Sequence, residues 1–597
     1  MAFPKRGEDR ATALVAVAFF AYVALRAVRV PIVHDEAFSY LNFVGRPFAT
    51  IVSVETVEPV NNHVLNSLLA RVASLAFGPS EWALRLPNVL AFGVFLACGI
   101  ALFRRFSGTA ARVSGFLLFA ANPFLLELFS LSRGYGLGLA FLSAALLAFV
   151  RAEEGPDSAR RDLLLGGLSG FLAVFANLAF LLPVLALLGV VAVRNRRVLR
   201  RSAPLLAVAP LLVAAILGPR IVALKRAGQF YAGGTKGFFA DTVGSLVRIT
   251  EEGAGGGPLV RAIVVAATAG LLLLALVGIL APSLAGGGRI ARVAGSVLLL
   301  AAAGSVTQHH LLGTPYLEDR TAIFFVPLLA LGAAGGLDAL EASPRSPARI
   351  AGRTCAVVLA ALALTLLVRS ANVDRTTLWR YDADVRHVVN DLTALHAEGL
   401  GRIRLGGNWV FEPALNFYRE TRRLAWLEPV VRNDPLDRCD VVLTSVYDRV
   451  PVPEGEFLER RGFPLSGNVL LVRVHPAGSG RRLREDAGLT GSIDDPAEDE
   501  TVHGTLRVRG WARIPGEDLR VAIHIDGFIR MDASGERKPR PDVANAVPSL
   551  GDCSGAGYVA VIPFRPGDEG RHVIEVVFAS ADGRERHYDA RRFTWIR

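Results

Sequence analysis

Residues 11–43 read ATALVAVAFFAYVALRAVRVPIVHDEAFSYLNF, an apolar run that is followed at once by polar and aromatic side chains. The run is about 20 residues long, which is the length that an α-helix needs to cross the hydrocarbon core of a membrane. Two adjacent carboxylates, Asp35 and Glu36, stand where such a helix leaves the membrane. Solvated acids in an interfacial loop are the simple interpretation, but ionisable groups at this depth are also typical of functional sites.

The composition indicates an integral membrane protein. Of the 597 residues, 52% are hydrophobic and 20% are charged, and the mean hydropathy is +0.40. The net charge of +11 comes from arginine clusters that punctuate the apolar runs. No basic stripe alternates with aromatic residues, which argues against nucleic acid as a partner. The four cysteines are scattered, which excludes a disulfide framework.

Further apolar segments predict a polytopic α-helical protein with about 11 spanning helices. The predicted spans are residues 11–30, 84–103, 113–130, 135–150, 163–177, 178–193, 203–220, 259–281, 292–310, 321–340 and 350–369. Lys and Arg residues gather in alternate loops, so the positive-inside rule predicts a cytoplasmic N-terminus, retained as a signal anchor, in a bacterial-type inner membrane. Residues 31–83, residues 221–258 and everything after Ser370 are then expected on the extracytoplasmic side.

Three domains are predicted, and residues 1–370 form the transmembrane domain. Residues 371–478 combine a helical pattern in RYDADVRHVVNDLTALHAEG with short buried strands such as CDVVLTS, which indicates an extracytoplasmic α/β domain. Residues 479–597 alternate polar and apolar residues between Gly, Asp and Pro turns, as in TLRVRGWARI. This alternation predicts an accessory β-sandwich domain on the same side of the membrane.

A second polar cluster precedes the second predicted span. It contains Glu58, Asn61, Asn62 and His63, and the residues from Val64 onward carry apolar side chains at helical spacing. This stripe predicts an amphipathic helix that lies in the plane of the membrane interface. The two polar clusters are therefore expected at the same depth.

The order of these motifs resembles that of the membrane-embedded glycosyltransferases of the GT-C class. The protein O-mannosyltransferase and aminoarabinose-transferase-like families are similar in three features: an acidic pair after the first span, Asn-Asn-His before an interfacial helix, and GPSEWALRLPNVLA leading into the next span. Later segments of the same class resemble SLSRGYGLGLAFL (130–142), QFYAGGTKGFFADTVGSL (229–246) and YLEDRTAIFFVPLLAL (316–331).

The resemblance implies an inverting transfer of a sugar, a hexose or a pentose, from a polyprenyl-phosphate carrier to an acceptor hydroxyl on the extracytoplasmic side. Such a transfer needs a base for the hydroxyl, and a carboxylate that is partly desolvated at the membrane boundary is more basic than one in water. By the family's pattern, Asp35 is the favoured base and Glu36 is the second candidate. The implied partners are membrane lipid, the lipid-linked sugar, and a glycan, lipid or protein acceptor.

The departing phosphate calls for cations and hydrogen-bond donors on the same side of the membrane. Its candidate ligands are Arg133, Tyr135, Arg320, Lys225 and Lys236. Arg320 could equally anchor the start of a helix, and Tyr135 could belong to an interfacial aromatic belt. The candidates for binding the sugar are Glu58, Asn61, Asn62, His63, Tyr316 and Asp319.

The scheme needs no cofactor, although Asp35, Glu58 and His63 could hold a divalent metal ion. Some relatives place a lysine directly after the acid of the second cluster. Pro59 stands there in this chain, so the phosphate depends on the arginines or on His63. Two alternatives from other classes are a polytopic transporter or flippase for lipid-linked sugars and a non-catalytic envelope protein that binds glycans. A transporter usually has internal repeats and polar sites at mid-membrane depth, which the sequence lacks.

Overall fold

The computed structural model describes residues 6–597 apart from a set of gaps. The gaps are residues 53–60, 156–157, 195–210, 212–214, 217, 220, 223–232, 282–285, 433, 435, 446–451, 453–455, 474–489, 514–518, 526–527, 534–536, 565–568 and 581–584. The chain divides into two compact units, Met1–Trp379 and Arg380–Arg597.

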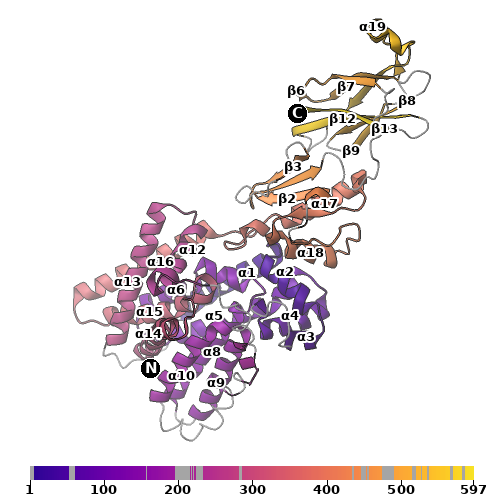
Figure 1. Cartoon of the computed structure of the whole chain (residues 1–597). Helices are drawn as coiled ribbons and strands as arrows, with labels where there is room; N and C mark the ends of the chain where they lie inside the picture. Colours follow the sequence, from indigo (N-terminus) through magenta and orange to yellow (C-terminus); the bar gives the residue numbers. More distant parts are fainter. Residues whose placement is uncertain are drawn as a thin grey trace. The chain divides into compact units, whose positions relative to one another are not determined.

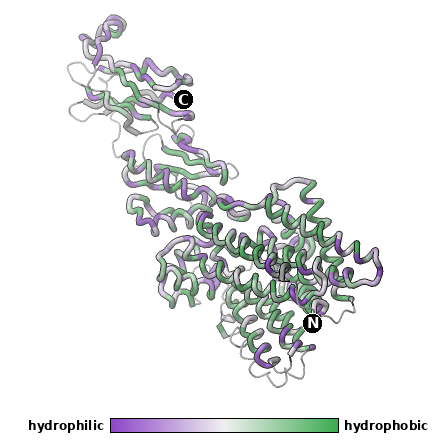
Figure 2. Tube along the Cα trace, turned by 180° about the vertical axis from the view of Figure 1, so that it is seen from behind, coloured by the Kyte–Doolittle hydropathy of each residue, from purple (hydrophilic) through white to green (hydrophobic). Residues whose placement is uncertain are grey.

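The first unit is a bundle of mainly apolar helices, as the hydropathy of its residues in Figure 2 shows. Helices α13 to α16 pack side by side in this bundle (Figure 1), and one large cluster of buried apolar side chains joins most of the spanning helices. In chain order the helices are α1 (Arg6–Arg29), α2 (His34–Ser39), η1 (Tyr40–Val44), α3 (Phe48–Val52), α4 (Val64–Phe77), α5 (Glu81–Phe103), α6 (Thr109–Ala120), α7 (Pro123–Phe129), α8 (Tyr135–Glu154), α9 (Ala159–Ala176), η3 (Leu178–Phe180), α10 (Leu181–Arg194), η4 (Phe239–Val243), α12 (Gly244–Gly253), α13 (Pro258–Leu280), α14 (Gly286–Leu312), η5 (Asp319–Ala322), α15 (Phe325–Glu341) and α16 (Ser346–Ser370).

These helices confirm the prediction of a multi-pass α-helical membrane protein. In the described part of the chain, seven helices are long and apolar enough to cross a membrane, or eight if α6 and α7, which are bent by 55° relative to each other, form one span. All eight coincide with predicted spans. The predicted spans 163–177 and 178–193 correspond to α9, which has three charged residues in its first turn, and to the shorter apolar helix Leu178–Arg194. Most of the predicted span 203–220 lies outside the described residues.

The connection between α1 and α5 is made of short helices and the amphipathic helix α4. One face of α4 buries Ala70 and Ala73, whereas Leu69, Val72 and Leu75 are exposed. Exposed apolar side chains on one face fit a helix that lies along the membrane surface, as the sequence predicts. The two polar clusters of the sequence lie on α2 and directly before α4, in the same connection.

The two ends of the helix bundle carry different polar groups. Ion pairs tie the C-terminal ends of α5, α8 and α10 together at one end: Arg105–Glu154 at 2.7 Å and Arg194–Glu153 at 2.6 Å. At the opposite end α1 finishes and α5, α8 and α15 begin, and here lie Asp35 and Glu36. The acidic pair is therefore separated by the length of the spans from the basic loops.

The second unit starts with a four-stranded sheet in the order β1-β2-β4-β3. Strands β1 and β2 are parallel and the other pairs are antiparallel. All five residues of β2, VVLTS, are buried, as the predicted interior strand requires. The elements are α17 (Val385–Leu395), β1 (Leu405–Gly407), α18 (Glu412–Thr421), β2 (Val441–Ser445), β3 (Phe457–Phe463) and β4 (Asn468–Arg473).

The C-terminal strands form two sheets, in the orders β10-β11-β7-β5 and β6-β13-β12-β8-β9. Alternate side chains of β7 and β8 are buried, and the buried side chains of both sheets join one apolar cluster, which is how the layers of a β-sandwich pack. The strands are β5 (Thr490–Asp495), β6 (Glu500–His503), β7 (Leu506–Arg513), β8 (Leu519–Ile525), β9 (Phe528–Asp532), β10 (Arg537–Lys538), β11 (Gly557–Ile562), β12 (Gly570–Ser580) and β13 (Glu585–Ile596). The predicted domain boundaries stay predictions, and residues 371–379 belong to the first compact unit.

Candidate active site

Glu36 of α2 forms a closed ion pair with Arg85 of α5. The Nε of Arg85 donates to Oε1 at 2.8 Å and its Nη2 donates to Oε2 at 2.5 Å, and both side chains are fully buried. The same carboxylate accepts hydrogen bonds from the main-chain N–H of Ser132 at 2.6 Å and of Val33 at 3.2 Å. Both carboxylate oxygens are therefore engaged inside the protein. This geometry favours a structural role for Glu36 and leaves Asp35 as the stronger candidate base.

Arg85 also binds the chain where the first spanning helix ends. Its guanidinium group donates to the main-chain oxygens of Ala27 at 3.1 Å, Val30 at 2.7 Å and Pro31 at 2.8 Å. The last carbonyl groups of a helix have no partner within the helix, and a buried helix end needs donors of this kind. Arg85 thus joins the end of α1, the start of α2 and the start of α5 at one point.

A glycine turn brings Arg133 to Asp35. Gly134 follows Arg133 and has φ +56°, in the left-handed region that favours glycine. A Cβ at this position would lie 2.4 Å from the carbonyl oxygen of Ala176 and 3.1 Å from the Cβ of His63. Only glycine therefore lets the chain turn tightly enough to direct Arg133 back towards α2.

The side-chain amides of two buried asparagines stabilise the turn that contains Arg133 and Gly134. Asn66 of α4 donates to the main-chain oxygen of Ser132 at 3.1 Å, and Asn88 of α5 donates to Asn66 at 2.7 Å. Asn88 in turn accepts a hydrogen bond from the main-chain N–H of Leu137 at 3.2 Å. Each of these amides is satisfied in the low-dielectric interior, so the network stabilises one conformation of the loop. The position of Arg133 follows from that conformation.

Asp35 lies between two guanidinium groups. Nη2 of Arg133 is 3.0 Å from its Oδ2, and Nη2 of Arg320, from the short helix η5, is 3.3 Å from the same oxygen. Oδ2 is buried, and none of the described residues donates a hydrogen bond to it. Buried polar atoms nearly always have a hydrogen-bond partner. An oxygen in this state is suited to accept a hydrogen bond from a bound hydroxyl.

The two arginines keep Asp35 ionised. Burial by itself raises the pKa of this carboxyl, but the charges of Arg133 and Arg320 outweigh burial and lower the pKa from 3.8 to about 2. The carboxylate is therefore available to accept a proton at neutral pH. Its proton affinity is low, however, as long as both guanidinium groups stay beside it.

The lowered pKa predicts a stability effect that is confined to acid pH. Because the pKa of Asp35 in the folded protein, about 2, lies below its ordinary value of 3.8, the ionised carboxylate stabilises the fold above about pH 4, and this contribution is lost as the pH falls towards 2. The difference in melting temperature between wild type and Asp35→Asn in detergent should be constant from about pH 5 to 8. A difference that varies within that range would show that Asp35 titrates there.

The two asparagines of the second cluster have different surroundings. Asn61 lies at the site, because its Oδ1 accepts a hydrogen bond from Nη2 of Arg133 at 3.1 Å. The side chain of Asn62 binds within the connection instead. It donates to the main-chain oxygen of Ile51 at 2.9 Å and accepts from the hydroxyl of Ser67 at 3.0 Å. Asn61 therefore orients a candidate phosphate ligand, whereas Asn62 holds the fold before α4.

His63 and Tyr135 lie side by side next to Arg133. Their ring centroids are 5.5 Å apart, in an edge-to-face arrangement. Burial and the charge of Arg133 lower the pKa of His63 well below its usual value, so the imidazole is neutral at pH 7. Its Nε2 is buried without a hydrogen-bond partner among the described residues. A neutral imidazole with one unused nitrogen fits the predicted role of a sugar or phosphate ligand.

The remaining described candidates lie in η5 or on the neighbouring loops. Tyr316 pairs through its main chain with Gly234, with N–O distances of 2.8 and 3.1 Å, and Lys236 follows in the same loop. The carboxylate of Asp319 lies 3.4 Å from the guanidinium group of Arg248. None of these three candidates has an ion pair or hydrogen bond to Asp35 in the described part of the chain. They surround the element that carries Arg320 rather than the carboxylate itself.

Two candidates, Lys225 and Glu58, lie outside the described residues. The metal site considered from the sequence consists of Asp35, Glu58 and His63, so its third ligand belongs to this part of the chain. Within the described residues, no group of three or more His, Cys, Asp or Glu side chains could hold a metal ion. The described donors at Asp35 are guanidinium groups, which suit an anion better than a cation.

The sequence did not identify two residues of the site, Arg85 and Trp379. The motif GPSEWALRLPNVLA contains Arg85, and an arginine at the start of an apolar span is a usable signal for a buried ionic partner. Trp379 follows α16, and the guanidinium carbon of Arg320 lies 5.0 Å from the centroid of its ring. No local sequence pattern connects Arg320 with Trp379, because the two residues are far apart in the sequence.

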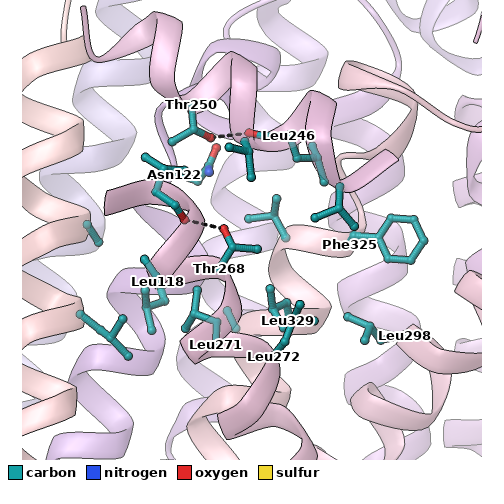
Figure 3. Close-up of a pocket in the computed structure, with 18 of the residues that line it drawn as sticks. Leu118, Asn122, Leu246, Thr250, Thr268, Leu271, Leu272, Leu298, Phe325 and Leu329 are labelled. Carbon is teal, nitrogen blue, oxygen red and sulfur yellow. Dashed lines mark hydrogen bonds between the residues drawn. The ribbon is translucent and has the colours of Figure 1, made fainter. Parts of the chain in front are cut away.

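An apolar cavity of about 280 Å³ lies among α12, α13, α14, α15 and α16. Figure 3 shows leucine side chains of these helices and Phe325 lining it. The hydroxyls of Thr250 and Thr268 donate to main-chain oxygens one turn earlier in their own helices, each at 2.8 Å. The cavity therefore presents an almost purely apolar surface. Phe325 is five residues after Arg320, so one segment contributes to the cavity and to the ionic site.

Comparisons of this chain with known proteins find matches among solved structures. Neither a protein-family model nor a curated protein sequence matches the chain. Among solved structures the chain is similar to ArnT, an aminoarabinose transferase, from Cupriavidus metallidurans. The ArnT structure bound to undecaprenyl phosphate has 14% identity and a TM-score of 0.48 over 78% of this chain and 98% of that chain, and the apo structure has 13% and 0.47 over 77% and 97%.

Arabinofuranosyltransferase AftD from Mycobacteria is also similar, with 15% identity and a TM-score of 0.40 over 84% of this chain and 42% of that chain. With every TM-score below 0.5, the likeness gives no guide to individual residues. The chemistry has to be judged from the side chains.

Proposed function

We propose that the chain is a membrane glycosyltransferase of the GT-C type that moves one sugar from a polyprenyl-phosphate carrier to an acceptor hydroxyl. The observation that carries the proposal is the state of Asp35 Oδ2. This oxygen is buried, ionised, without a hydrogen-bond donor among the described residues, and within 3.3 Å of two guanidinium groups. A proton acceptor and two phosphate ligands at one point are what a transfer from a phosphate-linked sugar requires.

In the proposed step Asp35 accepts the proton of the acceptor hydroxyl. The acceptor oxygen forms a bond to the anomeric carbon, and the bond from that carbon to the phosphate oxygen breaks. The electron pair leaves with the polyprenyl phosphate, whose negative charge Arg133 and Arg320 neutralise. A single displacement of this kind inverts the configuration of the sugar. Glu36 takes no part, because Arg85 and Ser132 occupy its oxygens.

The apolar cavity is suited to bind part of the lipid tail of the donor. Its wall contains Ala267 of α13, whereas Ala266, the preceding residue, is exposed. The tail already lies in the hydrocarbon of the bilayer, so it enters such a cavity without a hydrophobic gain, and van der Waals contacts with the apolar lining hold it there.

Filling the cavity should weaken donor binding without affecting the chemistry. We expect Ala267→Trp to raise the KM for the long-chain donor by about tenfold, which corresponds to roughly 1.4 kcal/mol of lost binding energy. The kcat should change little, because Asp35, Arg133 and Arg320 are not among the residues that line the cavity. Ala266→Trp, which adds the same side chain to the exposed face, is the matched control. Equal effects of the two variants would argue against the cavity as a lipid site.

We further propose that the site faces the extracytoplasmic side of a bacterial-type inner membrane. At the opposite end of the bundle, Arg104, Arg105 and Arg112 lie at the connection between α5 and α6, and Arg151, Arg160 and Arg161 lie at the connection between α8 and α9. Short loops rich in Lys and Arg stay in the cytoplasm. The acceptor, whether glycan, lipid or protein, then meets the donor outside the cell, where nucleotide sugars are absent and lipid-linked donors are used instead.

Mass spectrometry of lipid-linked sugars and envelope glycans tests the function in cells that contain wild-type protein, Asp35→Asn or no protein. A transferase predicts that donor accumulates and one glycan residue is lost both without the protein and with Asp35→Asn. A flippase or a glycan-binding assembly protein predicts that Asp35→Asn behaves like wild type. Transfer by the purified protein with and without EDTA tests the metal candidate in addition.

A further inference from the structure

A buried ion pair that the proposed reaction does not use holds the segment after the last span. Arg26 of α1 and Glu127 of α7 lie 3.5 Å apart, and both are almost fully buried. Arg26 donates to the main-chain oxygens of Asn372 at 2.6 Å and Arg375 at 2.9 Å. Glu127 accepts from the main-chain N–H of Thr377 at 2.9 Å. The segment 372–377 is therefore fastened to the bundle through its backbone.

Trp379 comes two residues after this segment, and its indole ring lies beside Arg320. The guanidinium carbon of Arg320 is 5.0 Å from the ring centroid, within the range of a cation–π interaction. Trp379 is only 3% exposed, so its ring is fixed by packing. The Arg26–Glu127 pair thus determines where an aromatic surface meets the second phosphate ligand.

The two arginines beside Asp35 are held in different ways. Arg133 is 2% exposed and is fixed by hydrogen bonds to Ser39 Oγ at 3.0 Å and Asn61 Oδ1 at 3.1 Å. The side chain of Arg320 is 33% exposed, and a flat ring supports its guanidinium group. The greater exposure of Arg320 leaves its guanidinium group more room to move than the enclosed guanidinium group of Arg133 has. Arg320 is therefore the ligand that can turn towards a newly bound anion.

We propose that Trp379 is a positioning residue that keeps the Arg320 guanidinium group on Asp35 until a lipid phosphate takes it, so that the carboxylate serves as a base only after the donor has bound. The proposal rests on the proposed function. A phosphate offers bidentate, charge-assisted hydrogen bonds that compete directly with the single-oxygen contact between Arg320 and Asp35. When Arg320 turns to the phosphate, Asp35 loses one of the two arginines that lie beside it among the described residues and becomes a stronger proton acceptor.

The order of events follows from this exchange. Before the lipid-linked sugar binds, both guanidinium groups lie beside Oδ2 of Asp35, and an acceptor hydroxyl that reaches the site is not deprotonated. With a donor, the group that neutralises the leaving phosphate is the same group whose departure activates the base. One movement of Arg320 on Trp379 therefore links the two requirements of the reaction.

The emission of Trp379 reports the movement directly. Protein in nanodiscs is titrated with undecaprenyl phosphate while tryptophan fluorescence and ligand binding are measured in parallel, and the signal of Trp379→Phe is subtracted. We expect a saturable change in the emission of Trp379 that follows binding and is absent in Arg320→Ala. Trp82→Leu, which removes an exposed tryptophan of α5, should leave the change intact.

Kinetics separates positioning from a merely structural role. Trp379→Leu should lower kcat/KM by about 5- to 30-fold, the range of one partly desolvated cation–π contact, and should have almost no further effect in an Arg320→Ala background, because coupled residues are not additive. Trp379→Phe keeps an aromatic ring and should recover most of the activity. Additive losses, or bound undecaprenyl phosphate without a change in emission, would overturn the inference but leave the proposed function intact. No binding of undecaprenyl phosphate at all would overturn both.

Discussion

Asp35→Asn should abolish sugar transfer while the protein still binds its donor. An amide has almost the shape of the carboxylate but cannot accept the proton of the acceptor hydroxyl, so we expect kcat to fall by about 10²- to 10⁴-fold. Arg133 and Arg320 lose their internal anion and stay available to the phosphate, so the affinity for undecaprenyl phosphate should be equal to or higher than that of wild type. Transfer and ligand binding are measured on the same reconstituted samples.

Asp35→Glu is the matched control for this prediction, because it keeps the charge and moves the carboxylate by one methylene group. It should retain part of the activity and have a melting temperature close to that of wild type. Full activity of Asp35→Asn in folded protein would refute the assignment of Asp35 as the base. Loss of donor binding in Asp35→Asn would show instead that the carboxylate orders the arginines.

Glu36→Gln should strongly destabilise the fold. The substitution removes the anion that faces the fully buried guanidinium group of Arg85. Breaking one partner of a buried ion pair typically costs about 3 to 5 kcal/mol, because the other charge is left in the low-dielectric interior. Hydrogen bonds to the carboxylate from Ser132 and Val33 weaken as well. We expect a sharp fall in the yield of monodisperse protein and in its melting temperature.

The double variant Arg85→Met, Glu36→Leu distinguishes destabilisation by an unpaired buried charge from destabilisation by the loss of side-chain contacts. The double variant buries no unpaired charge and should be more stable than Glu36→Gln alone. It should not reach wild type, because Arg85 also binds three main-chain oxygens. If Glu36→Gln were instead as stable as wild type but inactive, Glu36 would have to take part in the chemistry, contrary to the assignment made here.

The membrane architecture is the part that the sequence predicts best. An apolar run of about 20 residues indicates a membrane span. Such a run and the polar loops that flank it are recognised from a short stretch of sequence. Ends of spans share one depth, so the sequence could also predict that Asp35, Arg133 and Arg320 meet. The alternation of β7 and β8 similarly predicted strands with one buried face.

The roles of the two adjacent acids could not be separated in this way. Asp35 and Glu36 are neighbours on α2, and only their partners in space, Arg133 and Arg85, distinguish a reactive group from a structural one. Those partners come from loops and helices about 50 to 100 positions away, and no periodicity carries such information. The contact between Arg320 and Trp379 could not be predicted from the sequence for the same reason. Short sequence patterns predict helices and strands, whereas the side-chain contacts between them depend on the conformation of the connecting turns.

The bond between Arg85 and Glu36 also has a consequence for how the chain is made. The arginine enters the membrane with the second long apolar segment, and its counter-ion is already present at the exit of the first. Each charge alone is costly in hydrocarbon, so the nascent first segment has to remain next to the insertion machinery until the second arrives. Biogenesis of this protein should therefore proceed by joint release of a helical hairpin into the lipid rather than by one helix at a time.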